Sequence, residues 1–188
     1  MIIKSYEINK INLNTNHFFL LHGKNEGLKN EVIKNLTKTS GENLRYEEKE
    51  VLNNENNFIE NILSKSLFDP QRFIVIKRVT EKILKVIETL QLKNFQDTII
   101  ILNSENLEKK SKLRSFFEKD KKLVCVPFYP DNDQALSKLA YNFLREKKIS
   151  ISSSNINLIV NKCSGDRETL INELQKIELF SKNGKQIN

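Results

Sequence analysis

Five short apolar runs separated by helical patterns constrain the fold of this chain more than any other feature of its sequence. The runs are rich in Val, Ile, Leu and Phe, and they lie at residues 17–23, 44–51, 72–79, 97–103 and 122–128. Apolar residues at helical spacing lie between them, at 28–36, 58–63, 83–90 and 113–117. Strands that alternate with helices indicate right-handed βαβ units. The sequence therefore predicts an α/β fold with a five-stranded parallel sheet, whose last three strands lack alternation and are expected to be buried on both faces.

The pattern changes at "PFYPDND", residues 127–133, because only helical patterns follow. The first of three expected helices begins after Asp131 or Asp133, either of which can cap it. The second is expected to stop at Gly165, and the third runs from there to Phe180. The sequence thus predicts two domains, an α/β domain over residues 1–130 and a small three-helix lid domain over residues 131–188.

Composition excludes some classes of protein and leaves others open. The chain carries 31 basic and 24 acidic residues, a net charge of +7, which permits contact with nucleic acid but does not establish it. No apolar run reaches the ~18 residues that a membrane span needs, and the N-terminus lacks the apolar core of a signal peptide. Cys125 and Cys163 lie within apolar patterns and are expected to be buried free thiols rather than a disulfide or a zinc site. We expect a cytoplasmic protein without a membrane partner.

The stretch "FFLLHGKNEGLKNEVIKNL" has the strand, glycine loop and helix of a phosphate-binding loop. A working loop reads G-x-x-x-x-G-K-[ST]. Gly23 and Lys29 occupy the first-glycine and lysine positions, and Gly27 also lies in the loop. Leu28 replaces the second glycine and would crowd the phosphates, while Asn30 replaces the hydroxyl that binds Mg²⁺. The pattern indicates a degenerate loop.

A magnesium-binding carboxylate is also missing from the ends of the predicted strands. The run over 72–79 has Lys77 and Arg78 near its end, and the next run ends in Asn103 and Ser104. We therefore expect neither ATP hydrolysis nor a nucleotide cofactor at this loop. The alternative is a P-loop nucleotide-binding ATPase or kinase with an atypical loop, which Gly23 and the loop lysine favour.

Together these segments resemble the delta subunit family of the bacterial DNA polymerase III clamp loader. The matching segments, which cover nearly the whole chain in the family's order, are "FFLLHGKNEGLKNEVIKNL", "SLFDPQRFIVIKRV", "DTIIILNSENLEKKSKL", "CVPFYPDNDQALSKLAYNFLREKKISI" and "SGDRETLINELQKIELF". The resemblance implies an AAA+-like P-loop NTPase fold without ATPase activity, followed by a helical collar domain. The collar is expected to be absent from this chain, which ends at Asn188.

The resemblance also implies a function in DNA replication. The delta family binds the sliding clamp (beta subunit) and helps to open it for loading onto DNA, within a hetero-oligomer of clamp-loader subunits. Such a subunit is not an enzyme by itself, although it serves the DNA-directed DNA polymerase, a nucleotidyltransferase. Leu67 and Phe68 in "SKSLFDPQRF" match the family's clamp-binding hydrophobic wedge. Pro70 disfavours helix at Asp69, so the pair is expected at a helix end; the alternative is that both side chains cap the core.

Further residues are of interest because of their charge or their chemistry. Lys109, Lys110, Lys112 and Arg114 could lie near DNA in the assembled complex, since lysine and arginine bind phosphates without reading sequence, and the alternative is an ordinary solvated surface. Arg167 in "GDRETL" lies near the place where the lid of an active relative has an arginine facing the nucleotide. His17 and His22 have no Ser, Cys or acidic partner at triad-like spacing, so no catalytic residue and no metal ligand is expected.

Overall fold

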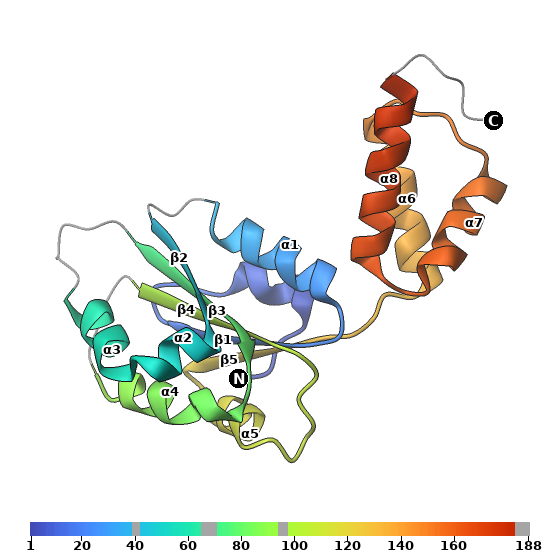
Figure 1. The fold of residues 1–188 in the computed structure, drawn as a ribbon. Coiled ribbons are helices and arrows are strands. Elements are labelled where there is room, and N and C mark those ends of the chain that lie inside the picture. The colour runs from blue at the N-terminus through green and yellow to red at the C-terminus, as the bar shows by residue number, and fades with distance from the viewer. Residues whose placement is uncertain (39–41, 65–70, 94–97, 183–188) are drawn as a thin grey trace. The chain divides into compact units, whose positions relative to one another are not determined.

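The structure, a computed structural model, describes residues 1–38, 42–64, 71–93 and 98–182 (Figure 1). Its centre is a five-stranded sheet in the order β2-β3-β4-β1-β5, in which every pair of neighbours is parallel. The strands are β1 (Phe18–Gly23), β2 (Glu42–Glu47), β3 (Arg72–Val79), β4 (Thr98–Ser104) and β5 (Leu123–Phe128). This confirms the predicted α/β fold with a five-stranded parallel sheet.

Helices join the strands and cover the sheet. They are the 3₁₀ helices η1 (Ser5–Lys10) and η2 (Glu81–Ile83), with α1 (Glu26–Leu36), α2 (Glu48–Asn53), α3 (Glu55–Leu63), α4 (Leu84–Gln91) and α5 (Lys112–Lys119). One core cluster joins alternate residues of the strands to the apolar faces of α3, α4 and α5, including Phe58, Ile87 and Phe117. In Figure 1 these helices lie on one side of the sheet and α1 lies on the other. Strands β1 and β4 are buried along their whole length, as runs covered on both faces should be.

The prediction of a strand over residues 44–51 is wrong in its second half. Strand β2 ends at Glu47, and α2 starts at Glu48. The Glu47 backbone N–H donates to the Glu50 carboxylate at 2.7 Å, which caps the new helix. The Glu48 carboxylate is buried and accepts from the backbone N–H of Thr80 at 2.7 Å. These two bonds, one local and one to the residue that follows β3, accompany the turn of the chain out of the sheet at its edge strand.

Contacts divide the chain into two units, which we describe separately. The first contains Met1–Lys24 and Lys29–Phe128, and the second contains Asn25–Leu28 and Tyr129–Asn188. The sequence predicts a single boundary after residue 130. It does not predict that Asn25–Leu28, four residues of the phosphate loop, belong to the second unit.

The second unit holds helices α6 (Asp133–Glu146), α7 (Ser153–Cys163) and α8 (Arg167–Lys182) around a small apolar core. The cap of α6 is Asn132, whose Oδ1 accepts from the Ala135 N–H at 2.8 Å, rather than Asp131 or Asp133. Helix α7 ends in a left-handed turn, with φ +49° at Ser164 and +82° at Gly165. Among the residues that the structure describes, no helix is long and apolar enough to span a membrane.

Candidate functional site: a degenerate phosphate loop

The loop after β1 keeps its first glycine for a structural reason. Gly23 has φ +131°, a conformation that side chains other than glycine rarely adopt. A Cβ built there would lie 2.1 Å from the carbonyl oxygen of Phe128 on the neighbouring strand β5. The Gly23 N–H donates to the Glu105 carbonyl at 3.1 Å. The sharp exit from β1 therefore requires glycine whether or not the loop holds a phosphate.

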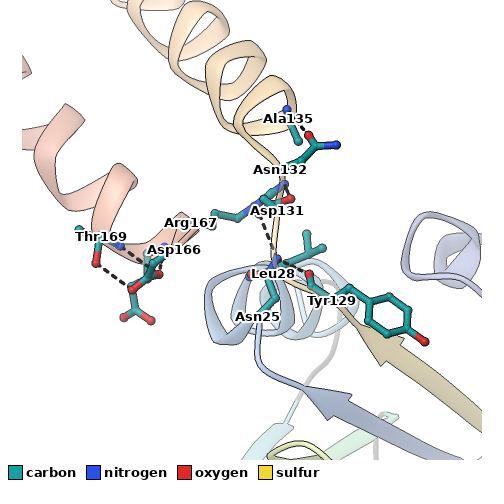
Figure 2. Close-up of polar contacts among 10 residues, drawn as sticks. Asn25, Leu28, Tyr129, Asp131, Asn132, Ala135, Asp166, Arg167 and Thr169 are labelled. Atoms are coloured by element: carbon teal, nitrogen blue, oxygen red, sulfur yellow. Dashed lines mark hydrogen bonds and ion pairs between the residues drawn. The ribbon is translucent and has the colours of Figure 1, made fainter. Parts of the chain in front are cut away.

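The first turn of α1 is capped by the chain's own side chain (Figure 2). The Oδ1 atom of Asn25 accepts from the Leu28 N–H at 3.0 Å, which is the bond of a helix N-cap. Its Nδ2 donates to the Tyr129 carbonyl and to Asp131 Oδ2, both at 3.0 Å. The amide groups at a helix N-terminus are the usual phosphate donors of such a loop. In this chain the side-chain oxygen of Asn25 already accepts a hydrogen bond from one of those amide groups, the Leu28 N–H.

Arg167 and Asp131 form a mostly buried ion pair beside this cap (Figure 2). Arg167 Nε donates to Asp131 Oδ2 at 2.7 Å and its NH2 group donates to Oδ1 at 3.1 Å, so the pair is bidentate. The two side chains are 14% and 10% exposed. Gly27 lies against the same place, because a Cβ there would approach the Glu168 backbone nitrogen to 2.9 Å. Arg167, predicted near the position of a nucleotide-facing arginine, is thus bound to a carboxylate of its own chain.

The lysine of the loop is directed into the first unit. Lys29 is 0% exposed, and its Nζ donates to the Ser104 carbonyl oxygen at the end of β4, at 2.6 Å. In a working loop the same lysine reaches the β- and γ-phosphates. In this chain the Lys29 ammonium donates to a backbone carbonyl.

The remaining positions of the motif do not fit a magnesium nucleotide either. Asn30, in the place of the metal-binding hydroxyl, is exposed. Near the end of β3, Arg78 lies at a register shift with φ +54° and pairs with Glu47 at 2.7 Å. The Ser104 hydroxyl donates to the Val79 carbonyl at 2.6 Å. Among the described residues no group of three or more His, Cys, Asp or Glu side chains is placed to hold a metal ion.

His22 is a buried residue for which the sequence does not predict the hydrogen bonding of the imidazole. It is 3% exposed, and within the described part of the chain neither ring nitrogen has a hydrogen-bond partner. Burial, followed by the positive charge of Arg114, lowers the pKa of His22 to about 4. The imidazole is therefore neutral near pH 7. Its place within an apolar run was the signal for burial, but no sequence pattern shows that both nitrogens lack partners.

The four basic residues predicted near DNA do not share one environment. Lys109, Lys110 and Lys112 are exposed, and Lys110 pairs with Glu108 at 3.0 Å. Arg114 is only 18% exposed and donates to the Glu118 carboxylate at 2.7 Å and to the Leu107 carbonyl at 3.0 Å. The lysines thus form an exposed group at the start of α5, while Arg114 supports the fold of that helix.

The predicted clamp-binding residues, Leu67 and Phe68, lie outside the described residues. Helix α3 ends before them at Leu63, where the backbone N–H of Ser64 donates to the Glu60 carbonyl at 2.8 Å. The chain resumes just before Arg72, the first residue of β3.

Comparison with known proteins shows the fold. No family model and no curated protein sequence matches the chain. Among solved structures, the DNA clamp loader delta protein of Bacillus subtilis (YqeN) is 15% identical with a TM-score of 0.58, over 97% of this chain and 58% of that one. Domain III of the Thermotoga maritima replication initiation protein DnaA is 15% identical with a TM-score of 0.60, over 98% and 84%. A RuvB variant from the same organism is 12% identical with a TM-score of 0.58, over 92% and 58%.

These structures belong to the AAA+ P-loop class, so the chain has an AAA+-like fold. It spans little more than half the length of the clamp loader delta structure.

Proposed function

We propose that this chain is a non-catalytic subunit of a bacterial DNA polymerase III clamp loader, which binds the sliding clamp and helps to open it. The observation that carries the proposal is the buried Lys29, whose ammonium group bonds to the Ser104 carbonyl at 2.6 Å. This contact, together with Leu28 and Asn30 in the motif, supports a protein that acts by binding rather than by hydrolysis. The likeness of the fold to a clamp loader delta protein supports a place in replication.

Arg72 joins the described residues on either side of positions 65–70. The side chain of Arg72, at the start of β3, is buried, and its NH2 group donates to the Asn61 and Ile62 carbonyls at 3.1 and 3.2 Å. These carbonyls lie in the last turn of α3, where a cationic side chain satisfies acceptors that the helix leaves open. Arg72 therefore links the start of β3 to the end of α3.

Because α3 and β3 are already linked, a partner that binds near them would have to order little of the rest of the domain. Leu67 and Phe68 are proposed to insert into a pocket of the sliding clamp. Opening follows if they bind the open or strained clamp more tightly than the closed one, because only differential affinity shifts such an equilibrium. A buried aromatic anchor is typically worth at least ~2 kcal/mol in an interface.

Other loader subunits and DNA are the remaining proposed partners. In the assembled complex, Lys109, Lys110 and Lys112 could contact phosphates, because all three are exposed on the first unit. Contacts of this kind add affinity without base specificity and weaken as salt rises. Arg114 is left out of this group because its guanidinium is already engaged.

The test is a titration of the chain with its sliding clamp, alongside the Leu67→Ala/Phe68→Ala double variant. We expect the variant to bind about 100-fold more weakly, which corresponds to about 2.7 kcal/mol. Leu92→Ala is a matched control, because Leu92 is 86% exposed in the same unit, and it should bind as the wild type does. Equal binding by the double variant would place the contact elsewhere. No binding by a folded wild-type chain, with saturable binding of Mg·ATP, would favour the nucleotide-binding alternative.

A further inference from the structure

Three side chains in the second unit, Asn25, Asp131 and Arg167, form a polar network that clamp binding does not use. They come from distant parts of the sequence, since Asp131 lies 106 residues after Asn25 and 36 before Arg167. Two groups that attract anions meet at this network, the Arg167 guanidinium and, through the Asn25 amide, the first turn of α1 (Figure 2). The Arg167 guanidinium and the Asn25 side-chain amide both donate to the Asp131 carboxylate, while the Leu28 N–H of the first turn donates to the Asn25 side-chain oxygen.

The carboxylate has little capacity left for another donor. Asp131 Oδ2 accepts from Arg167 Nε and Asn25 Nδ2, and Oδ1 accepts from the Arg167 NH2 group. A carboxylate offers about four lone-pair positions, so at least three are filled. Both hydrogens of the Asn25 amide are also used, since Nδ2 bonds the Tyr129 carbonyl as well. An external anion would therefore have to displace a group that the chain itself holds in place.

The backbone of the loop near the network packs closely against the start of α8. Gly27 passes so close to the start of α8 that a Cβ would lie 2.9 Å from the Glu168 nitrogen. Asp166 caps the same helix end, because its Oδ1 accepts from the Glu168 N–H at 2.9 Å. Where the loop meets the helix end, the Leu28 amide is bonded by the Asn25 side chain and the Glu168 amide by the Asp166 side chain.

We propose that Asp131 is a built-in anion. Its carboxylate replaces the phosphate group of a working loop. It binds Arg167 directly and the first turn of α1 through the Asn25 side chain. The segment Asn25–Leu28 is thereby held on the three-helix unit without any nucleotide. This inference concerns the second unit alone, and it stands whichever partner the chain binds.

The proposal is tested by removing the carboxylate and supplying an anion. The variant Asp131→Ala should unfold about 10 °C below the wild type, because it removes a bidentate carboxylate from a mostly buried guanidinium. Inorganic pyrophosphate, compared with chloride at equal ionic strength and without magnesium, should restore at least half of that loss. Pyrophosphate should also restore the protection of the Leu28 amide against hydrogen exchange, which reports directly on the capped turn.

Three comparisons make the result specific. The wild type should show no gain with pyrophosphate, and the double variant Asp131→Ala/Arg167→Ala should lose stability without being rescued. Asp133→Ala removes the same charge from an exposed residue two positions away and should behave as the wild type does.

An equal gain in the wild type would show that the loop still accepts an external anion and would overturn the proposal. It would equally be overturned if pyrophosphate gave no gain in Asp131→Ala or, should that variant fail to fold, in the milder Asp131→Asn.

Discussion

Replacing Lys29 distinguishes a structural lysine from a nucleotide-binding one. In a working phosphate loop the lysine contacts the ligand, so its removal abolishes binding and leaves the free protein folded. In this chain the side chain is fully buried and its Nζ lies 2.6 Å from the Ser104 carbonyl oxygen. We therefore expect Lys29→Ala to destabilise the first unit in the absence of any ligand.

The magnitude follows from three contributions. Losing a hydrogen bond from a charged donor costs about 1.5–3 kcal/mol. Losing the burial of the three methylenes beyond Cβ costs about 0.8 kcal/mol each, or about 2.4 kcal/mol in all. The wild-type ammonium has already lost its hydration at a cost of several kcal/mol, which the variant recovers. The net loss in the free energy of unfolding should be about 1–2 kcal/mol for Lys29→Ala and less than about 1 kcal/mol for Lys29→Met, which keeps most of the apolar contact.

Urea unfolding followed by far-ultraviolet circular dichroism is a suitable assay, because the chain contains no tryptophan. Lys34→Ala is the matched control: Lys34 is exposed on the same helix α1, and its replacement should change stability by less than about 0.5 kcal/mol. Each protein is measured with and without Mg·ATP. A ligand at 100 times its Kd would add about 2.7 kcal/mol, which this assay resolves easily.

One pattern of results would refute the structural role of Lys29. If Lys29→Ala unfolded at the same urea concentration as the wild type, and Mg·ATP stabilised only the wild type, the lysine would be serving a nucleotide. The reasoning for a non-catalytic subunit would then lose its main support.

Two further predictions concern the same region. Gly23→Ala should lower the free energy of unfolding by more than about 3 kcal/mol, because φ is +131° and the new Cβ would clash with the Phe128 carbonyl. Urea unfolding measures this loss, and Lys24→Ala, at an exposed neighbouring position, is the control. His22 should make stability depend on pH between about 4 and 6.5. Its pKa is about 4 in the folded chain and about 6.5 when unfolded, so the unfolded state takes up the proton first and stability falls as pH drops through this range. We expect His22→Leu to unfold with a shallower pH dependence, and an unchanged slope would contradict the buried, neutral imidazole.

The strands were predictable where burial dominates the sequence. The run over 72–79 coincides with β3, and the runs for β4 and β5 begin within one residue of the observed strands. Strands β3 and β4 lie inside the sheet and β5 lies at the edge opposite β2, yet all three are buried along most of their length, so nearly every residue is apolar. Strand β2 lies at the edge and is partly exposed. Its composition is therefore set less by the core, and the turn at Glu47 depends on a side-chain cap that periodicity does not show.

The loop was identifiable from sequence, but its use was not. Spacing places Gly23 and Lys29 in the motif, and residue types show which positions have changed. The hydrogen-bond partner of the Lys29 side chain is the Ser104 carbonyl, 75 residues away, and local sequence does not show it. The cap of α6 shows the same limit, since three consecutive residues can each cap a helix. In the structure Asp131 is paired with Arg167, and Asn132 caps the helix.

The strand order also has a consequence for how the protein is synthesised. Strand β1 pairs with β4 on one side and with β5 on the other, so Phe18 lies opposite both Ile100 and Leu123. As the first strand of this sheet to be synthesised, β1 thus has both hydrogen-bonding edges open until β4 has emerged about 80 residues later, and one edge open until β5 follows about 105 residues after β1. At 5–20 residues per second this interval lasts roughly 5–20 s. During it the apolar run from Phe18 to Leu21 is an exposed, adhesive segment that a nascent-chain chaperone would be expected to cover.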